Sequence, residues 1–442
     1  MGFVSHGPFD GQCCPISTLP RRVGIGFNTE SCHSYTENPP LSLPLSPDLG
    51  GGREGFRCSR EVKYNVNVPN LSSNTVKIMK RFFKPIVKGE DKDGNGVDGD
   101  VNCDGPLKKK LNQSGEANND NEKEPAKLEP CKFMTWNSNS LLLRVKNNWA
   151  EFTSLVQRVD PDVIAIQEVR MPAAGSKGAP KNPGELKDDT NSAREEKRIL
   201  LRALSSPPMG NYRVWWSLAD SKYGGTALFI KRRFQPQKVS FSLDKSSSRH
   251  EPDGRVILAE FESFYILNTY VPNNGWKDEE NSFQRRRKWD KRMLEFVIRL
   301  GKPLVWCGDL NVSHEDIDVS HKEFFSNARL NGYIPPNKED CGQPGFTIAE
   351  RQRFSKILRE GRLLDAYRFL HKEQDVNCGF TWSGNPVGKY RGKRMRIDYF
   401  IVSEVLKDRI ISCKIHGQGI ELEGFCGSDH CPVSLELSPV LV

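Results

Sequence analysis

Short apolar runs that alternate with amphipathic stretches begin at residue 133 and continue almost to the end of the chain. Short apolar runs bounded by polar or turn residues are typical of buried strands. They predict strands over 133–136, 163–166, 227–230, 256–261, 265–270, 304–307, 397–402 and 431–437. Apolar residues at helical spacing predict helices over 148–159, 193–204 and 281–300. This mixture of buried strands and amphipathic helices predicts an α/β sandwich.

The first 130 residues show neither a strand nor a helix period. Residues 1–75 are rich in Pro, Gly and Ser, and Gly, Asn, Asp, Glu and Lys dominate residues 84–130. So little apolar surface cannot offset the entropy lost on ordering. We therefore expect a long disordered N-terminal region over 1–130, with an acidic linker over 84–130, before one folded domain over 131–439.

Charge and cysteine content narrow the class of protein. The chain carries 65 Lys and Arg against 56 Asp and Glu, a net charge of +9 that favours a polyanionic partner. Its 12 cysteines form no Cys-x-x-Cys pair, which argues against a zinc site or a disulfide framework. No apolar run is long enough to span a bilayer, so we expect a soluble intracellular protein without a membrane partner. Arg21-Arg22 and nearby serines leave an organelle-targeting peptide open.

Polar residues that suit phosphate chemistry stand at the ends of several predicted strands, which is where α/β folds build their sites. Each of them follows or precedes a buried apolar run directly. They are Glu168, Asp309, Asn311, Asp398, Asp429 and His430. A lone Asp-His pair is more often structural than catalytic, but four acids with Asn and His partners favour one functional site.

Each of these residue types has a distinct use in phosphodiester hydrolysis. A carboxylate such as Glu168 at the tip of a buried strand needs a compensating cation, and Mg²⁺ prefers such ligands. The alternative is a surface glutamate in an ion pair. Asp309 can accept a proton from an attacking water, and Asn311 can donate to a phosphate oxygen. Asp398 can hold His430 in one tautomer.

A turn and two basic clusters add candidate substrate contacts. Tyr270 and Asn273 lie in a turn after the strand over 265–270, where the tyrosine could also merely cap the core. The cluster over 285–288 reads equally well as solvated charge. The cluster over 389–394 interleaves positive charge with a tyrosine and runs into the strand of Asp398, which suits a grip on a DNA backbone. Its basic members include Lys389, Arg391 and Arg394.

These motifs, in this order, make the region over 132–437 resemble the exonuclease III-type apurinic/apyrimidinic endonucleases of the endonuclease/exonuclease/phosphatase superfamily, and most of all their plant members. The motifs that carry the resemblance are Trp136-Asn137, Gln167-Glu168, Tyr223-Gly-Gly225, Gly254-Arg-Val-Ile257, Tyr270-Val-Pro-Asn273, Gly308-Asp-Leu-Asn-Val312, Gly345-Phe-Thr347, Arg396-Ile-Asp-Tyr399 and Gly427-Ser-Asp-His430. The resemblance implies two packed mixed β-sheets flanked by helices in four layers.

The resemblance also implies an activity. A DNA repair phosphodiesterase of this type cuts double-stranded DNA 5′ to abasic sites and clears blocked 3′ ends, leaving a 3′ hydroxyl for base excision repair. It implies Mg²⁺, with Mn²⁺ as the alternative, and a monomeric nuclear enzyme.

The family's roles transfer to this chain residue by residue. The implied metal ligands are Asn139, Glu168, Asp309, Asn311, Asp429 and His430. The implied catalytic residues are Tyr270, Asp309, Asn311, Asp398 and His430. The implied DNA contacts are Asn137, Tyr223 and Asn273, joined by Met395 and Ile397 in the pocket for the flipped sugar.

Asn139 stands where family members carry either Asp or Asn, so the metal site has one carboxylate fewer than in the members with Asp. Two departures from the family pattern bear on substrate choice. Met395 stands where well-known members have Trp, and Ile397 stands in place of Leu. The segment over 321–343 is longer than usual. Because Met is a softer and less specifying pocket wall, we expect weaker incision of intact abasic sites relative to trimming of blocked 3′ ends.

The N-terminal region contains short motifs of lower specificity. Phe82-Phe83 within 76–83 resembles the motif by which repair proteins dock on the sliding clamp, although Val76 replaces its Gln. The alternative is a chance aromatic pair. Lys108-Lys109-Lys110 suits a nuclear import signal or a solvating charge cluster.

Two other functions remain open at this level. The first is a different phosphoesterase of the same superfamily, acting on inositol phosphates, sphingomyelin or tyrosyl-DNA adducts. The second is a non-catalytic repair scaffold that works through the Phe82-Phe83 segment.

Overall fold

The computed structural model describes residues 128–175, 181–244, 249–274, 279–327, 337–373, 379–384, 387–418 and 422–439. The Phe82-Phe83 motif and almost all of the linker predicted over 84–130 lie outside these residues. The boundaries predicted for the N-terminal region and the folded domain therefore stay predictions.

Two six-stranded mixed sheets form the centre of the molecule. The first has the strand order β15, β16, β1, β2, β6 and β5, with bounds Ile410–Ile415, Val433–Leu437, Lys132–Asn137, Val163–Gln167, Thr226–Lys231 and Tyr212–Ser217. The second has the order β11, β14, β10, β9, β8 and β7, with bounds Leu363–Asp365, Asp398–Ser403, Leu304–Asp309, Tyr265–Tyr270, Val256–Glu260 and Lys238–Ser240. Each sheet has one parallel pair, β1 with β2 and β9 with β10.

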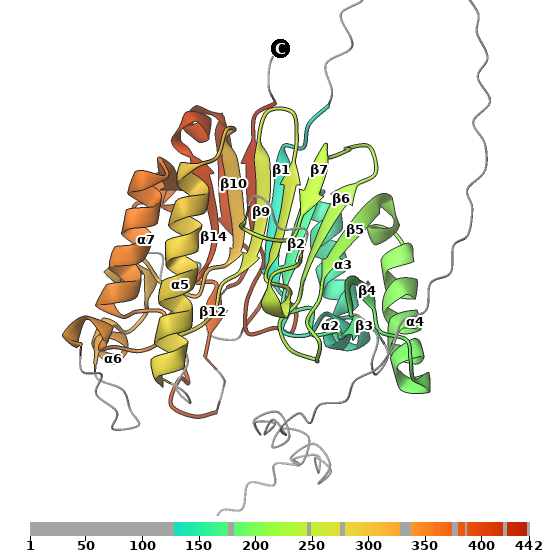
Figure 1. Cartoon of the computed structure of the whole chain (residues 1–442), viewed down its shortest axis with the longest axis horizontal. Helices are drawn as coiled ribbons and strands as arrows, with labels where there is room; N and C mark the ends of the chain where they lie inside the picture. The colour runs from blue at the N-terminus through green and yellow to red at the C-terminus, as the bar shows by residue number, and fades with distance from the viewer. Residues whose placement is uncertain are drawn as a thin grey trace, which may run out of the picture. The chain divides into compact units, whose positions relative to one another are not determined.

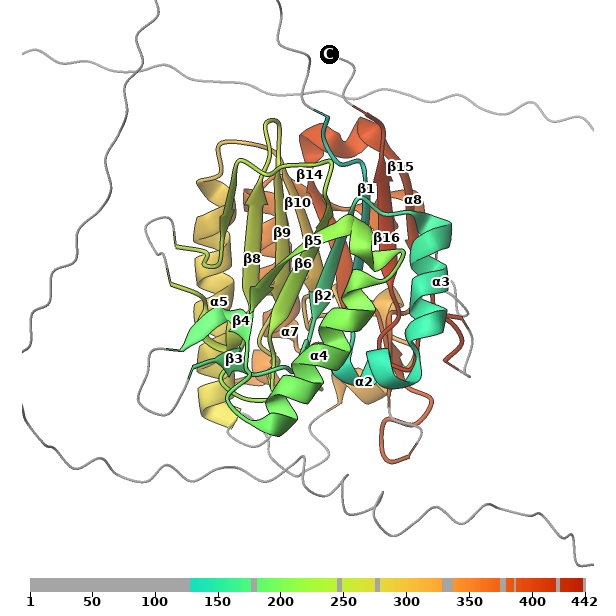
Figure 2. The ribbon, with the colours of Figure 1, turned by 90° about the vertical axis from the view of Figure 1, so that its right-hand side faces the viewer.

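Helices cover the outer face of each sheet, as Figures 1 and 2 show. The helices on the first sheet are α2 (Leu141–Asn147), α3 (Trp149–Val159) and α4 (Asn191–Ser205). Those on the second are α5 (Glu279–Ile298) and α7 (Ile348–Glu360). The predicted four-layer sandwich, helix on sheet on sheet on helix, is confirmed.

The remaining elements are short. Two pairs of strands lie outside the main sheets: β3 (Ala173–Ala174) with β4 (Asn182–Leu186), and β12 (Trp382–Ser383) with β13 (Arg394–Met395). The short helices are α6 (Lys322–Ser326), α8 (Ala366–Leu370) and the 3₁₀ turns Met209–Asn211, Pro252–Gly254, Asp316–Asp318, Lys338–Asp340 and Glu404–Arg409.

Three apolar layers hold the sandwich together. Alternate residues of a strand point to opposite faces, so Phe133 of β1 packs between the sheets while Met134 packs under α2 and α3. In the second sheet, Val305 of β10 faces the first sheet and Trp306 packs under α5 and α7. Because both faces of each sheet are covered, the central strands are continuous apolar runs.

All the strands and helices expected from the apolar pattern are present, with ends displaced by no more than two residues. The pattern missed the helices α2 and α7, the four edge strands β5, β15, β7 and β11, and the short elements outside the main sheets. An edge strand exposes part of its side chains, and Lys414 interrupts the apolar run of β15. For α7 a usable signal existed, because Thr347 and Glu350 form the capping box that starts the helix.

No helix in the described part of the chain has the length and apolar character needed to cross a membrane.

The layer between the sheets yields a stability prediction. Phe133 is 1% exposed, and its ring packs against Phe264 and Phe400 from the second sheet. Phe133→Ala should lower the free energy of unfolding by about 3–5 kcal/mol, because it leaves a cavity in this layer. Urea unfolding followed by tryptophan fluorescence measures the loss. Leu201→Ala, on the exposed face of α4, is the control and should change it by about 0.5 kcal/mol or less.

Candidate active site

Strand register brings the predicted acids together at one end of the sandwich. In the second sheet, Asp309 at the end of β10 lies directly across from Asp398 at the start of β14. On its other side Asp309 pairs with Tyr270 of β9. The first sheet contributes Glu168, which follows β2, and His430, which forms a bridge to β12 before β16 begins. Residues far apart in sequence therefore converge where these strands meet.

The backbone leaves its ordinary conformations where these strands end. Asn139, Glu168 and Asn311 have φ values of 44°, 50° and 48°, in the left-handed region that non-glycine residues seldom adopt. Such residues persist only where the surrounding structure enforces them, and they cluster at functional sites. This conformation turns each side chain out of the strand direction.

Asn137 joins the two sheets across the site. Its Nδ2 donates to Glu168 Oε1 at 3.1 Å and to Asp309 Oδ2 at 2.9 Å. The residue is fully buried. The sequence had placed Asn137 among the DNA contacts, but its amide faces inward and holds one carboxylate from each sheet.

His430 and Asp398 form a buried pair. The Nδ1 atom of His430 lies 2.8 Å from Asp398 Oδ2. Burial lowers the pKa of this imidazole, but the Asp398 carboxylate more than offsets burial, with help from Asp309, and raises the pKa to about 10. The histidine is therefore charged at neutral pH, with Nδ1–H donating to Asp398. Its Nε2 lies 3.4 Å from the amide of Asn137.

Asp309 is held by the loop that follows it. The backbone N–H of Asn311 donates to Asp309 Oδ1 at 2.9 Å, and Asn311 Nδ2 lies 3.3 Å from Oδ2. Burial raises the pKa of Asp309 to about 7; His430 opposes this shift, while Asp398 and Glu168 act with it. A buried carboxylate with this pKa suits proton transfer at neutral pH.

Oxygen ligands for a divalent cation lie in the same cavity as Asp309 and His430. Asp429 accepts from Asn139 Nδ2 at 2.7 Å, and Glu168 is in an ion pair with Arg170. Carboxylate and amide oxygens are the donors that Mg²⁺ prefers. This donor chemistry fits a hard divalent cation.

A second set of possible ligands lies deeper. Ligand atoms of Asp309, Asp398 and His430 lie within 4.8 Å of one another, all buried. However, His430 Nδ1 and Asp398 Oδ2 already satisfy each other. Glu168 and Asp429 also line the active-site cavity, whereas Asp398 does not. We therefore regard Glu168 and Asp429, with Asn139 beside Asp429, as the better cation ligands.

The site opens into a cavity of about 310 Å³. The predicted residues that line it are Glu168, Tyr270, Asn273, Asp309, Asn311, Met395, Ile397, Asp429 and His430. Four further lining residues, Pro344, Gly345, Trp382 and Tyr390, were not among the site residues named from the sequence. Trp382 reaches the cavity because β12 pairs it with Met395, and its indole donates to Asp429 Oδ2 at 3.2 Å. No local spacing signals this position, because the pairing of β12 with β13 creates it.

The predicted DNA contacts fall into two groups. Tyr223, Asn273, Lys389 and Arg391 are exposed, and the hydroxyl of Tyr223 accepts from Arg255 at 3.0 Å. Arg394 is buried, so its side chain is withdrawn from the surface where the other two basic residues lie. Met395 and Ile397 are buried in the cavity wall, as expected for pocket residues.

Within the basic cluster over 285–288, Arg286 is a buried structural residue. It is 2% exposed, and its Nε donates to Asp290 at 2.9 Å. Its Nη1 donates to the carbonyls of Pro272 and Asn311, and its Nη2 to that of Leu310. This guanidinium therefore connects the loop after β9 with the loop after β10, a role that solvated charge does not explain.

Comparison with known proteins identifies the family. Residues 134–430 match the model of the Endonuclease/Exonuclease/phosphatase family. The chain is 69% identical to a DNA-(apurinic or apyrimidinic site) endonuclease of Arabidopsis thaliana over 361 residues, which cover 81% of this chain and 96% of the plant protein. It is 29% identical to an exodeoxyribonuclease of Bacillus subtilis, covering 69% of this chain and 98% of that protein.

A solved structure supports the fold. The AP endonuclease of Leishmania major has a TM-score of 0.51 at 21% identity, over 70% of this chain and 88% of that one. With the high identity to the plant enzyme, the chain belongs to the Endonuclease/Exonuclease/phosphatase family and, within it, to the apurinic/apyrimidinic endonucleases.

Proposed function

We propose that this protein is a Mg²⁺-dependent DNA repair phosphodiesterase that cuts 5′ to abasic sites and removes 3′-blocking groups, leaving a 3′ hydroxyl. Mn²⁺ is the alternative metal. The observation that carries the proposal is the buried trio Asp309, Asp398 and His430 beside the oxygen ligands of Glu168 and Asp429. Together with Glu168 and Asp429, the trio provides a base, a charged donor and a cation site around one cavity.

Asp309 is the base in this proposal. Its pKa lies near neutrality, so it can accept the proton of a water that attacks phosphorus. The two hydrogen bonds from Asn311 and the one from Asn137 hold its carboxylate in a single orientation. Such preorientation avoids reorganisation during the reaction.

Two hydrogen-bond donors can stabilise the negative charge on the reacting phosphate. His430 is cationic because Asp398 stabilises its charged form. Tyr270 remains a neutral phenol, because burial and the nearby Glu168 raise its pKa well above the ordinary value. Both side chains line the cavity, where each can donate to a phosphate oxygen. A divalent cation held by Glu168, Asp429 and Asn139 would act as a Lewis acid on the phosphate oxygens.

The wall of the cavity decides between substrates in this proposal. Met395 and Ile397 stand where the flipped sugar would enter, beside Trp382. The flexible thioether of Met395 fixes the position of a bare deoxyribose less specifically than a Trp indole at the same position would. Blocked 3′ ends need less pocket complementarity, because the reacting end is not enclosed by duplex on both sides. We therefore propose that cleaning of 3′ ends is a major activity.

Cellular context rests on the sequence alone. We propose a monomeric nuclear enzyme that docks on the sliding clamp through Phe82-Phe83. Three observations test these proposals. A tagged chain should localise to the nucleus, and the purified protein should sediment as a single species. The double substitution Phe82→Ala/Phe83→Ala should abolish capture of the protein by the sliding clamp. Capture that survives the double substitution removes the clamp proposal.

Asp309→Ala tests the proposed chemistry. On an abasic duplex and on a 3′-phosphoglycolate duplex, with Mg²⁺, kcat should fall about 10³-fold because the base is lost. Binding of DNA should change little, since the Asp309 carboxylate donates no hydrogen bond to a phosphate oxygen. A gel assay with and without Mg²⁺ measures both substrates. Asp408→Ala, an exposed acid, is the control. Full cleavage by Asp309→Ala contradicts the assignment of the base.

Met395→Trp tests the proposed substrate preference. A larger and stiffer wall should raise abasic-site incision relative to 3′-phosphoglycolate removal by about tenfold, within the range that pocket contacts give. The ratio of the two kcat/KM values is the readout. Ile298→Trp adds the same side chain at the exposed end of α5 and should leave the ratio unchanged. A wild-type enzyme that incises abasic DNA much faster than it clears 3′ ends contradicts the proposal.

Arg286→Gln tests whether the two loops must be held together. Losing the guanidinium frees three carbonyls, so Tyr270 and Asn311 should move and kcat should fall about 10²-fold. The KM for DNA should stay within a few fold, because Arg286 does not reach the surface. Arg286→Lys should not restore activity, since an ammonium lacks the planar fork. Circular dichroism checks folding, and Lys291→Gln on the same helix is the control. A variant whose KM rises while its kcat stays at the wild-type value contradicts a positioning role.

A further inference from the structure

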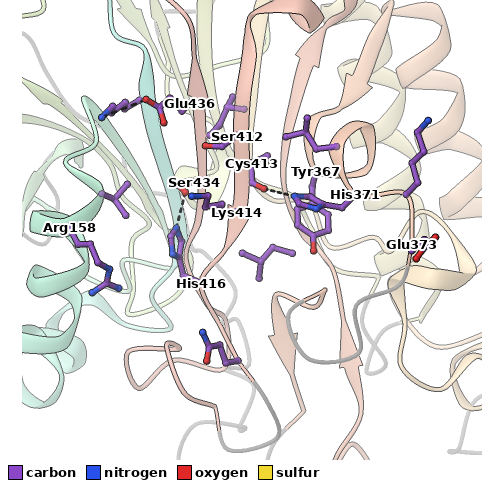
Figure 3. Close-up of a pocket in the computed structure, with 17 residues that line it drawn as sticks. Arg158, Tyr367, His371, Glu373, Ser412, Cys413, Lys414, His416, Ser434 and Glu436 are labelled. Carbon is purple, nitrogen blue, oxygen red and sulfur yellow. Dashed lines mark hydrogen bonds and ion pairs between the residues drawn. The ribbon is translucent and has the colours of Figure 1, made fainter.

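A second and larger cavity lies on the flank of the sandwich, beside the edge strand β15. It has a volume of about 1160 Å³ and extends between the C-terminal end of α3, the outer strands β15 and β16, and the region of α8. Figure 3 shows its lining, with Arg158 and His416 on one side and His371 and Glu373 on the other. We call it the β15 groove. It shares no lining residue with the active-site cavity.

Cations outnumber acids in the β15 groove. Its lining includes four Lys and Arg residues and two glutamates. They are Lys132, Arg158, Lys372, Lys414, Glu373 and Glu436. Glu436 faces Lys132 at 3.7 Å, with both side chains well exposed. Within the described parts of the chain, Arg158 and Lys414 have no ion-pair partner, and both are exposed.

These two cations line the same cavity as His416 and lie close enough to act on its imidazole. Burial lowers the pKa of its imidazole to about 4, and the positive charges of Arg158 and Lys414 act in the same direction. His416 is therefore neutral at physiological pH, and its Nε2 lies 2.8 Å from the hydroxyl of Ser434. Arg158 and Lys414 thus give this part of the groove a positive potential that an anion would neutralise.

One end of the β15 groove lies next to the chain segment that carries His430. The backbone N–H of His416 donates to the carbonyl of Pro432 at 2.9 Å, two residues after His430. The backbone N–H of Gln418, at the rim of the groove, donates to the carbonyl of Glu423 at 2.8 Å. A strand of DNA whose reacting nucleotide lies in the active-site cavity could therefore extend along this flank.

The active site itself needs such a contribution. Its cavity is lined by Glu168, Asp309 and Asp429, which repel the phosphates on either side of the reacting bond. Exposed cations at a distance from the reacting atoms must therefore supply much of the attraction for the DNA backbone. Lys389 and Arg391 can do this on one side, and Arg158 and Lys414 are placed to do it on another.

We propose that the β15 groove is an auxiliary site for the DNA sugar-phosphate backbone, in which Arg158 and Lys414 contact phosphates several nucleotides away from the reacting bond. The inference rests on the proposed DNA function. It predicts that affinity depends on duplex length, because only a duplex long enough to reach the groove gains these contacts.

The experiment compares Arg158→Ala/Lys414→Ala with the wild-type full chain on two abasic duplexes. One has about one helical turn, ~10 base pairs, and the other about three turns. For the long duplex, KM should rise roughly tenfold, and the slope of log affinity against log salt should fall in magnitude by about 2. For the short duplex, and for kcat on both, the variant should match the wild type. Arg202→Ala/Lys407→Ala removes the same charge from exposed positions of α4 and the turn Glu404–Arg409, and should leave both duplexes unaffected.

The outcomes separate the two proposals. A wild-type enzyme that fails to cleave either duplex refutes the DNA function itself. Cleavage of both duplexes, with an equal loss in the variant on each or with no loss, overturns the groove as a DNA site. An improved KM for the long duplex also overturns it, and is the result expected if an acidic protein segment occupies the groove instead.

A direct readout avoids activity altogether. In histidine-labelled wild-type protein, an undamaged long duplex should raise the pKa of His416, because a nearby phosphate stabilises the imidazolium. The short duplex should leave this pKa unchanged. A His416 signal that is indifferent to the long duplex contradicts the proposal.

Discussion

The structure depends on placing three carboxylates at the seam between two sheets. Glu168, Asp309 and Asp398 are all buried, and burying a charge without a partner is costly. The protein compensates with the amide of Asn137, the ion pair of Glu168 with Arg170 and the imidazolium of His430. Because Asn137 and Glu168 come from one sheet and Asp309 and Asp398 from the other, this network also fixes how the sheets meet. The catalytic arrangement and the packing of the sandwich are therefore one constraint.

The same constraint explains why the site is surrounded by structural residues that never touch substrate. Tyr270 ends β9 and Asn311 lies in the loop after β10, and Arg286 holds the loops that follow both strands through their carbonyls. On the other side, Arg396 binds Asp318 and Asp365 immediately before the strand that carries Asp398. A rigid site needs such support, because the reacting groups must be held to within a fraction of an ångström.

Much of this arrangement could be predicted from sequence, because strand ends and apolar runs are local signals. The acids, Asn311 and His430 each stand next to a buried run, so their convergence followed from the fold class. Arg286 could not be recognised, since a buried and an exposed arginine look alike in a basic helix. Trp382 was missed for a different reason: only the pairing of β12 with β13 carries it to the cavity. The inward orientation of Asn137 likewise depends on contacts between the two sheets, which no local pattern encodes.

Electrostatics gives the outer surface a role distinct from that of the centre. A hydrolytic centre built from acids binds a cation well and a polyanion poorly, so the forces that attract DNA and those that cut it must be separated in space. In this protein the acids lie at the seam, whereas exposed cations, such as Lys389 and the Arg158 and Lys414 of the β15 groove, lie away from it. Salt screens the exposed cations far more than the buried trio. Rising ionic strength should therefore weaken capture of long DNA before it alters the chemical step, and the two functions can be tuned independently by substitution.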